Sequence, residues 1–400
     1  MRIKAPPGHI AFILNRLSSE GHEGYLVGGS VRDAVLNRTV SDWDIATSAK
    51  PVEVASLFPK TVLTGEKFGT VTVVLPECSV EVTTFRTESD YIDGRHPENI
   101  EFATDLSEDL SRRDFTINAM AANVEGEIID PFDAQSDIEK GIIRGVGGPN
   151  TRFSEDALRM FRALRFSAEL GFEIEPETLK AIYANTGTAA QISSERIRIE
   201  LEKTLMSQRP EVAGEMIKIG LLGRFVAVSG KNPEGLEKIA NLPQEAMLRW
   251  CAFCAVLIKK DYIKTATELL HNLHLDGKTI KTCLRALTIS EFTADKTEIK
   301  LLLSKNDAEI VRCAAAAFDV TEKSSPGAVS LLRKTDDILK SGECVTIGNL
   351  AVAGKDLLEL GHSSGKGLGE TLNKLLEHVI ENPKDNTREK LLDIVETIKI

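Results

Sequence analysis

Apolar and polar positions alternate in two different ways along the chain. In the first 150 residues, short strand-like runs alternate with helix-like stretches and are separated by Gly and Pro. Strands are predicted at 24–27 and 42–45, and a hairpin is predicted from the β-branched runs 70–75 and 79–85. From Ser154 onward, apolar residues recur every three or four positions, which predicts nearly continuous helix. The pattern therefore predicts an α+β fold, with a mixed sheet in the head and an all-α remainder.

Composition indicates the cellular compartment of the protein but does not indicate its function. The chain has 400 residues, 42% hydrophobic and 27% charged, which is ordinary for a globular protein with several cores. No apolar run is long enough to span a membrane and the start is not secretory, so we expect a cytoplasmic protein without membrane contact. Six scattered cysteines predict reduced thiols, and the close pair Cys251 and Cys254 is interpreted as buried helix residues rather than a zinc site. A net charge of −11 does not exclude a local basic groove.

Two glycines mark the first candidate for chemistry. Gly28, Gly29 and Ser30 follow a predicted strand and open a predicted helix, where backbone N–H groups can hold phosphate. A simple tight turn explains the same glycines equally well. The motif alone therefore decides nothing.

A pair of carboxylates makes the phosphate interpretation stronger. Asp42 and Asp44 are two apart on a predicted strand, so we expect both side chains on one face, about 6–7 Å apart. Two carboxylates at one site repel each other unless cations lie between them, and Mg²⁺ prefers such oxygen ligands. Glu81 is a third candidate ligand if its strand is adjacent; otherwise it is a solvated surface residue.

Four motifs in order resemble one family. The motifs are Gly28-Gly29 with Val31-Arg32-Asp33 and Asp42 to Thr47, then Arg112 to Ala119, Asp130-Pro131-Phe132, and Glu155 to Arg159. With these motifs the chain resembles, from about residue 20 to 205, the class II tRNA nucleotidyltransferases, the bacterial CCA-adding enzymes and their poly(A) polymerase relatives.

The resemblance implies roles for individual residues. Asp42 and Asp44 would be the catalytic metal ligands for two Mg²⁺ ions, and Asp114 would sense the ribose 2′-OH. The residues implied to bind the incoming nucleotide are Gly28, Gly29, Ser30, Arg32, Arg113, Asp114, Glu155, Asp156, Arg159, Arg162 and Arg165. Arginine suits this task because its guanidinium makes bidentate contacts to phosphate that Lys cannot make.

The base-reading motif also has a physical argument. On one helix, Glu155 and Asp156 would lie on the same side as Arg159, offering an acceptor next to donors. That pattern matches the pairing edges of cytosine and adenine, whereas uracil and guanine would place a carbonyl against a carboxylate. The simpler interpretation is a salt bridge within the helix.

The resemblance implies an architecture and a reaction. It divides the chain into a nucleotidyltransferase head at 1–145, a neck at 146–210, a body at 211–340 and a tail at 341–400. The implied reaction adds C, C and A to the 3′ end of tRNA from CTP and ATP and releases pyrophosphate. The acceptor arm of tRNA, and not DNA, would be the partner.

Three alternatives remain open from the sequence. An enzyme that adds only A and a poly(A) polymerase share nearly all the motifs, and a non-catalytic RNA-binding protein would not need the paired carboxylates. The charged segment 86–100 resembles the full-length flexible loop of the family, which disfavours an enzyme that adds only CC. We expect this loop to move when the enzyme switches from C to A.

Overall fold

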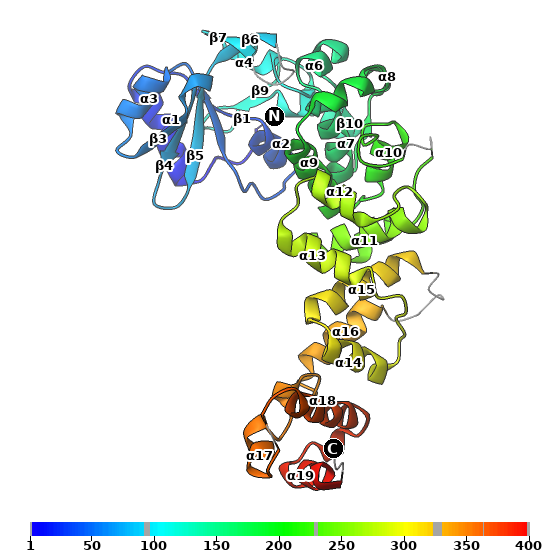
Figure 1. Cartoon of the computed structure of the whole chain (residues 1–400). Coiled ribbons are helices and arrows are strands. Elements are labelled where there is room, and N and C mark those ends of the chain that lie inside the picture. Colours follow the sequence, from blue (N-terminus) through cyan, green and yellow to red (C-terminus); the bar gives the residue numbers. More distant parts are fainter. Residues whose placement is uncertain (1, 92–96, 228–230, 323–329, 363, 398–400) are drawn as a thin grey trace. The chain divides into compact units, whose positions relative to one another are not determined.

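The structure is a computed structural model that describes residues 2–91, 97–227, 231–322, 330–362 and 364–397 (Figure 1). The chain forms two compact units. The first contains residues 1–204 and 218–224, and the second contains residues 205–217 and 225–400. The predicted division into head, neck, body and tail is finer than this and stays a prediction.

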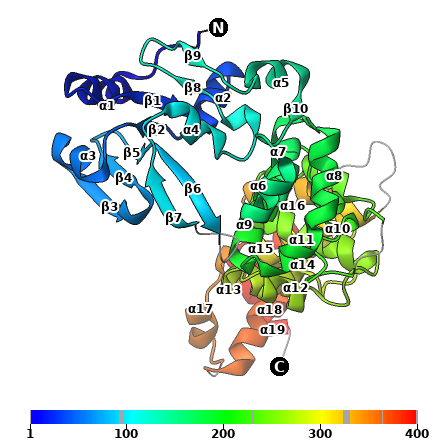
Figure 2. The ribbon, with the colours of Figure 1, turned by 90° about the horizontal axis from the view of Figure 1, so that it is seen from above.

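A seven-stranded mixed sheet organises the start of the first unit. Its strand order is β3-β4-β5-β2-β1-β8-β9, and β2 and β5 are the parallel neighbours in an otherwise antiparallel sheet. Figure 2 shows β3, β4, β5, β2 and β1 side by side in this order. The strands are β1 (Gly24–Val27), β2 (Asp44–Thr47), β3 (Thr61–Gly65), β4 (Thr70–Val74), β5 (Ser79–Thr84), β8 (Ala121–Ala122) and β9 (Ile128–Ile129). The predicted hairpin and mixed sheet are confirmed.

Helices cover both faces of this sheet. Helix α1 (Gly8–Ser19) lies against the face of Gly24, because a Cβ built on Gly24 would lie 3.1 Å from Leu17. Helix α4 (Leu106–Ser111) packs on the opposite face, where Leu106 and Leu110 share a core with Val27. The other helices of this region are α2 (Gly29–Val35), α3 (Pro51–Leu57), η1 (Glu66–Phe68) and η2 (Thr116–Asn118).

The segment predicted to be a flexible loop contains two strands. Strands β6 (Arg86–Tyr91) and β7 (Pro97–Phe102) pair antiparallel as a separate two-stranded sheet. Residues 92–96, at the centre of the predicted loop, lie outside the described residues. The role of this segment in the switch from C to A stays a prediction.

The rest of the first unit is mostly helical and also contains one short pair of parallel strands. Its elements are α5 (Ala134–Lys140), β10 (Ile142–Ile143), α6 (Pro149–Glu155), α7 (Leu158–Leu170), β11 (Glu173–Ile174), α8 (Pro176–Asn185), η3 (Thr186–Gln191) and α9 (Ser194–Met206). The sequence predicts one helix through 155–165, and this is wrong. The chain leaves the helix at Asp156, which has an extended backbone, and starts a new one at Leu158.

Helices alone build the second unit in the residues described. They are α10 (Val212–Lys218), which runs into the first unit, η4 (Leu236–Asn241), α11 (Ala246–Lys259), α12 (Ala266–Asn272), α13 (Gly277–Ala286), α14 (Lys296–Lys305), α15 (Ala308–Thr321), α16 (Leu331–Lys340), η5 (Ile347–Asn349), α17 (Gly354–Glu359), α18 (Lys366–Glu381), η6 (Pro383–Asp385) and α19 (Arg388–Thr397). The predicted helical remainder is confirmed, apart from the two-residue strand β11 of the first unit. Among the described helices, none combines the length and apolar character that crossing a membrane requires.

The cysteines of the second unit lie mainly in its core. Cys251 and Cys254 on α11, Cys283 on α13 and Cys313 on α15 are all buried, as predicted for the close pair. Hydrogen bonds to Cys283 and Cys313, together with burial, raise the pKa of the Cys251 thiol well above its ordinary value. Buried thiols of raised pKa are poor nucleophiles, so this cluster is a packing feature.

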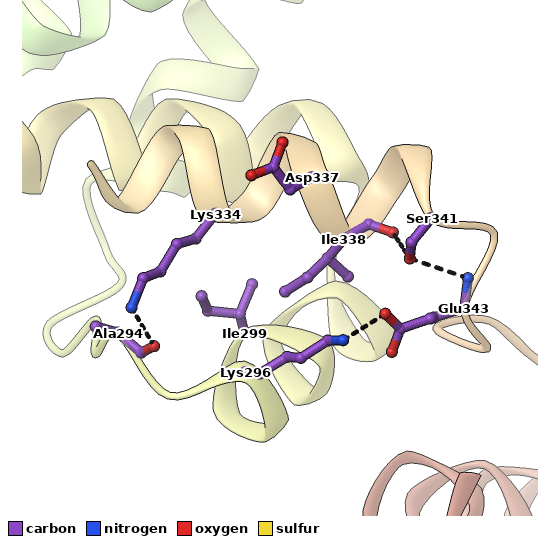
Figure 3. Close-up of a pocket in the computed structure, with 8 residues that line it drawn as sticks. All are labelled: Ala294, Lys296, Ile299, Lys334, Asp337, Ile338, Ser341 and Glu343. Atoms are coloured by element: carbon purple, nitrogen blue, oxygen red, sulfur yellow. Dashed lines mark hydrogen bonds and ion pairs between the residues drawn. The ribbon is translucent and has the colours of Figure 1, made fainter. Parts of the chain in front are cut away.

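A hollow of about 370 Å³ opens between α14 and α16 of the second unit (Figure 3). On one side Lys334 donates to the Ala294 carbonyl at 3.0 Å, and on the other Lys296 and Glu343 form an ion pair at 2.5 Å. Glu343 also pairs at 2.5 Å with Lys300, whose side chain is buried. These groups satisfy one another and tie α14 to the end of α16.

Candidate active site

A polar cavity of about 540 Å³ in the first unit brings the motifs together. It is lined by Gly28, Gly29, Ser30, Arg32, Asp33, Ser41, Asp42, Asp44, Arg112, Arg113, Asp114, Asn118, Asp156, Leu158, Arg159, Arg162, Arg165, Phe166, Arg196 and Lys203. Eight of these side chains are basic and five are acidic, in a chain whose net charge is −11. The cavity therefore concentrates positive charge that the composition does not reveal.

The two glycines form the turn from β1 into α2. Gly28 has φ of +72°, a conformation that favours glycine, and it precedes the first turn of α2. A Cβ at Gly28 would lie 3.0 Å from Nη1 of Arg113 and 3.8 Å from Oδ2 of Asp44. Ser30 Oγ donates to the Val27 carbonyl at 2.8 Å and fixes the turn. Glycine is thus required here so that a cation and a carboxylate can approach the turn.

The carboxylates lie at the beginning of β2, with one departure from the prediction. Strand β2 begins at Asp44, and Asp42 lies in the irregular segment before it, so the argument from strand alternation does not hold for Asp42. Both still line the cavity. Strand β5 is adjacent to β2, and Glu81 is the direct partner of Asp44 across the pair. Glu81 is therefore beside Asp44, although it does not line the cavity.

The electrostatics of Asp44 favour a bound cation. Asp44 is open to the cavity, yet its pKa is raised above the ordinary value. Loss of hydration is the largest cause, the negative charges of Glu81 and Asp42 raise the pKa further, and the positive charge of Arg113 lowers it. A cation would relieve this repulsion. Among the described residues, no three His, Cys, Asp or Glu side chains converge as a closed metal cage. An open site fits Mg²⁺, which commonly uses one or two carboxylates and takes its other ligands from phosphate and water.

Asp114 is a buried anchor for the arginines. Its Oδ2 accepts from Nε of Arg162 at 2.7 Å, and its Oδ1 accepts from Nδ2 of Asn118 at 3.1 Å. Burial alone would raise the pKa of Asp114, but Arg162, Asn118 and Arg159 outweigh it and lower the pKa to about 2. Asn118 in turn accepts from Nη1 of Arg32 at 2.7 Å. Asp114 thus stays ionised and joins α7 to α2 through one network.

The base-reading motif has a different geometry from the predicted one. Arg159 pairs with Glu155 at 2.6 Å, whereas Asp156 pairs with Arg196 of α9 at 2.7 Å. Asp156 Oδ1 also accepts from the Leu158 backbone N–H at 3.0 Å, which starts α7 after the break. The prediction that all three lie along one helix face is wrong, because the extended backbone of Asp156 ends α6 before α7 begins.

This break separates the roles of the acidic pair. Asp156 and Arg159 line the cavity, but Glu155 does not; Glu155 is held by both Arg152 and Arg159. Arg159 also donates through Nη2 to the Arg112 carbonyl at 3.1 Å. The cavity therefore presents one carboxylate and one guanidinium from the motif, and Glu155 lies behind the guanidinium.

Phe166 is a cavity residue that the sequence did not single out. The guanidinium carbons of Arg165, Arg32 and Arg162 lie 4.0, 5.1 and 5.2 Å from the centre of its ring. The ring is buried and makes an edge contact with Phe115. Arg165 itself is paired with Glu200 at 2.5 Å and Glu169 at 2.6 Å. Arg196 and Lys203 were also missed, because only tertiary contacts bring them to the motifs. Asn118 lies within the motif Arg112 to Ala119 but was not assigned a role.

Comparison with known proteins decides the family. A model described as "Poly A polymerase head domain" matches residues 24–144, and "Probable RNA and SrmB- binding site of polymerase A" matches residues 171–226. A tRNA nucleotidyltransferase domain 2 model matches residues 243–395. The CCA-adding enzyme of Geobacillus sp. strain WCH70 is 39% identical over 392 residues, which cover 95% of this chain and 94% of the relative. This chain belongs to the CCA-adding enzyme family.

Other members extend the comparison to solved structures. The CCA-adding enzyme of Lactobacillus gasseri is 54% identical over 233 residues, 58% of each chain. The crystal structure of the Bacillus stearothermophilus CCA-adding enzyme in complex with CTP has a TM-score of 0.75 and 33% identity, covering 97% of each chain. The Thermotoga maritima CCA-adding enzyme complexed with tRNA has a TM-score of 0.70 at 21% identity, so it shows a shared fold. The predicted resemblance to this family is confirmed.

Proposed function

We propose that this chain adds C, C and A to the 3′ end of tRNA from CTP and ATP by nucleotidyl transfer. The observation that carries the proposal is the cavity, in which Asp42 and Asp44 face a set of arginines. It lies in a chain that matches CCA-adding enzymes along 95% of its length. The α-phosphorus of the triphosphate would be attacked by the 3′-hydroxyl of tRNA, and pyrophosphate would leave.

The carboxylates would act at the reacting end of the nucleotide. We propose that Asp42 and Asp44 hold Mg²⁺, with Glu81 as an additional ligand or a neighbour that tunes Asp44. Two bound Mg²⁺ ions would activate the 3′-hydroxyl and neutralise charge on the phosphates. Gly28 keeps the turn clear of side-chain atoms at this point.

The arginines would hold the triphosphate. Arg32, Arg113 and Arg162 line the cavity, and Asn118 and Asp114 fix the first and third of them. A guanidinium that is already oriented loses less freedom when it binds phosphate. Arg165 is buried and doubly ion-paired, so in this proposal it supports the site through Phe166 as well as by its charge.

Asp156 and Arg159 would read the base. The Asp156 carboxylate would accept from the amino group of cytosine, and the Arg159 guanidinium would donate to its ring nitrogen or carbonyl; the same pair also fits adenine. A uracil or guanine carbonyl facing Asp156 would leave buried acceptors unpaired, at about 1–3 kcal/mol. Asp114, predicted to sense the ribose 2′-OH, is already fully bonded to Arg162, Asn118 and the Phe115 N–H, so that role stays a proposal.

The acceptor would be tRNA in the cytoplasm. We propose that the neck, body and tail at 146–400 contact its acceptor arm mainly through shape and backbone, as proteins generally read double-helical RNA. A poly(A) polymerase or an A-adding enzyme would use the same chemistry. The relatives that match nearly the whole chain are CCA-adding enzymes, which favours complete CCA addition.

One experiment separates these functions. Purified protein is incubated with tRNA transcripts that end at the discriminator base, after C and after CC, each with one labelled nucleoside triphosphate or with all four. Complete addition predicts C on the first two transcripts, a single A on the third, and products that stop at CCA. An A-adding enzyme would extend only the CC transcript, a poly(A) polymerase would add many A residues, and a binding protein would add none.

A further inference from the structure

The buried face of α4 contains one charged residue. Leu106, Asp109 and Leu110 are three and four positions apart and all face the interior, where the two leucines pack beside Val27 and Ala46. Asp109 is 0% exposed. A carboxylate in this position loses its hydration, which is costly unless cations and hydrogen bonds compensate it. The sheet face against which α4 packs is the face of Asp44, since Asp44 and Val27 are direct cross-strand partners.

Two neighbouring arginines compensate Asp109. Its Oδ1 accepts from Nε and Nη2 of Arg112 at 3.0 and 2.8 Å, and its Oδ2 accepts from Nη2 of Arg113 at 3.2 Å. Burial alone would raise the pKa of Asp109, but the two arginines outweigh it and lower the pKa. Asp109 is therefore an ionised group that holds both arginines from behind the cavity.

Arg113 connects Asp109 to the part of the cavity that contains Asp44. Its Nη2 is bound to Asp109, while its Nη1 lies 3.0 Å from the Cβ position of Gly28. Its positive charge lowers the pKa of Asp44, yet the two side chains are not ion-paired in the described structure. Its Nε is buried without a hydrogen-bond partner. The Asp109 contact is thus the bond that sets how far Arg113 turns toward Asp44.

Arg112 connects Asp109 to Arg159, which lines the part of the cavity proposed to read the base. The Arg112 guanidinium is fixed by Asp109, and its backbone carbonyl accepts from Nη2 of Arg159 at 3.1 Å. One buried carboxylate is therefore connected to both ends of the cavity through consecutive residues.

We propose that Asp109 is a positioning residue for nucleotide binding, acting mainly through Arg113. The inference rests on the proposed function, in which Arg113 contacts the triphosphate. Without the charge of Asp109, Arg113 loses its ion-pair partner and is drawn toward Asp44, whose Oδ2 also lies near the Cβ position of Gly28. An arginine that neutralises Asp44 would compete with Mg²⁺ and would no longer be available to phosphate.

The test compares Asp109→Asn, which keeps shape but removes charge, with the same substitution at a second buried carboxylate. Asp137 is also buried and binds Arg144 at 3.1 Å in the same unit, but neither residue lines the cavity. We expect Asp109→Asn to weaken CTP binding in Mg²⁺ by about tenfold, measured by calorimetry on the full chain, the order of one charge-assisted hydrogen bond. Asp137→Asn should lower the melting temperature similarly but leave CTP affinity unchanged.

A double-mutant cycle identifies the route. If Asp109 acts through Arg113, adding Asp109→Asn to Arg113→Ala changes CTP affinity by less than about twofold. The proposal is overturned if Asp109→Asn binds CTP like the wild type, if its effect adds fully to that of Arg113→Ala, or if Asp137→Asn weakens CTP equally. If Asp109→Asn does not fold, the charge-balanced pair Asp109→Asn with Arg112→Met replaces it, with Arg112→Met alone as its reference. Wild-type protein that binds no CTP would instead refute the proposed function.

Discussion

Phe166 concentrates the cationic residues of the cavity around one ring. Arg32, Arg162 and Arg165 come from two helices, and each also pairs with a polar side chain. The role of the ring is therefore to fix the spacing of the three guanidinium groups, not to balance their charge. A guanidinium over an aromatic face is stabilised by the ring quadrupole. This arrangement makes the aromatic character of residue 166, and not only its volume, important for the site.

Phe166→Leu should therefore weaken nucleotide binding without changing its selectivity. The variant keeps most of the apolar volume but removes about 0.5–2 kcal/mol of cation–π attraction per contact. We expect KM for CTP and for ATP to rise together by about 3- to 30-fold, while kcat changes little. Steady-state kinetics on one tRNA acceptor checks this. A fall in kcat with KM unchanged would contradict the idea that the ring orients binding residues.

Base selection provides a second test at the residue scale. Asp156→Ala or Arg159→Ala should reduce discrimination against UTP and GTP by about tenfold, more than it weakens triphosphate binding, because the base edge is read there. Relative kcat/KM for the four triphosphates measures the effect. Arg152→Ala is the matched control: Arg152 binds Glu155 at 2.8 Å but does not line the cavity, so selectivity should be retained. Equal loss in the control would mean that the motif is only a salt-bridge network.

The sequence predicted most cavity residues but not how they are connected. Asp42, Asp44, Arg32 and Arg159 lie in short motifs, where spacing and residue type already indicate the chemistry. Asp109 and Arg196 could not be found in this way. Asp109 looks like an ordinary polar position on a short helix, and Arg196 reaches Asp156 across 40 residues. Their importance depends on burial and tertiary contact, which local patterns do not contain.

At the scale of elements, Glu343 links α14 to the segment after α16. It pairs with Lys300, whose side chain is 5% exposed, and with Lys296, which is 60% exposed. Hydrogen bonds from Lys296 and Lys300 lower the pKa of Glu343 to about 2. Because the folded pKa lies below the unfolded value of 4.5, the stabilisation is complete above pH 4.5 and is lost as pH falls toward 2.

Glu343→Gln should accordingly destabilise the second unit at neutral pH by about 1–3 kcal/mol, because it leaves the buried Lys300 charge without its carboxylate. The expected loss of stability comes mainly from Lys300, because Glu343 is partly solvated and water screens the ion pair between Glu343 and Lys296. Calorimetric melting at pH 7 and pH 3 should show a difference from wild type that shrinks at the lower pH. Lys296→Gln, the exposed control, should change stability by less than about 1 kcal/mol. A difference independent of pH would contradict the ion-pair account.

Elements were predictable where residue type and periodicity agree. The β-branched runs gave β4 and β5 nearly to their ends, and Gly24 to Val27 is β1. Strands β6 and β7, in the segment predicted to be a loop, were missed, and two further failures occur at acidic residues before a helix or a strand. Asp156 satisfies the Leu158 N–H and so interrupts a continuous apolar period, and Asp42 lies outside the strand that its spacing suggested. Short polar side chains compete with the backbone for hydrogen bonds, which periodicity does not register.

At the scale of the whole molecule, charge and function are unevenly distributed. The chain carries −11 overall, whereas the cavity has three more basic than acidic side chains. Its residues all belong to the first unit, and the second unit is helical where it is described. The proposed function assigns nucleotide chemistry to the first and much of the tRNA contact to the second. Loss of chemistry should then be separable from loss of RNA binding.

Asp44→Ala tests this separation directly. Removing the carboxylate at the start of β2 should abolish nucleotide addition, because the proposed Mg²⁺ ligand is lost while the arginines that line the cavity remain. Binding of tRNA, measured by filter retention or fluorescence anisotropy, should stay within about threefold of wild type, since RNA affinity depends mainly on contacts to the phosphate backbone. Glu125→Ala, which changes an exposed carboxylate of the same unit outside the cavity, should retain both activities. Near-normal addition by Asp44→Ala would refute the metal assignment. Parallel loss of tRNA binding and addition would instead show that Asp44 supports the RNA-binding surface, and that chemistry and acceptor recognition share one site.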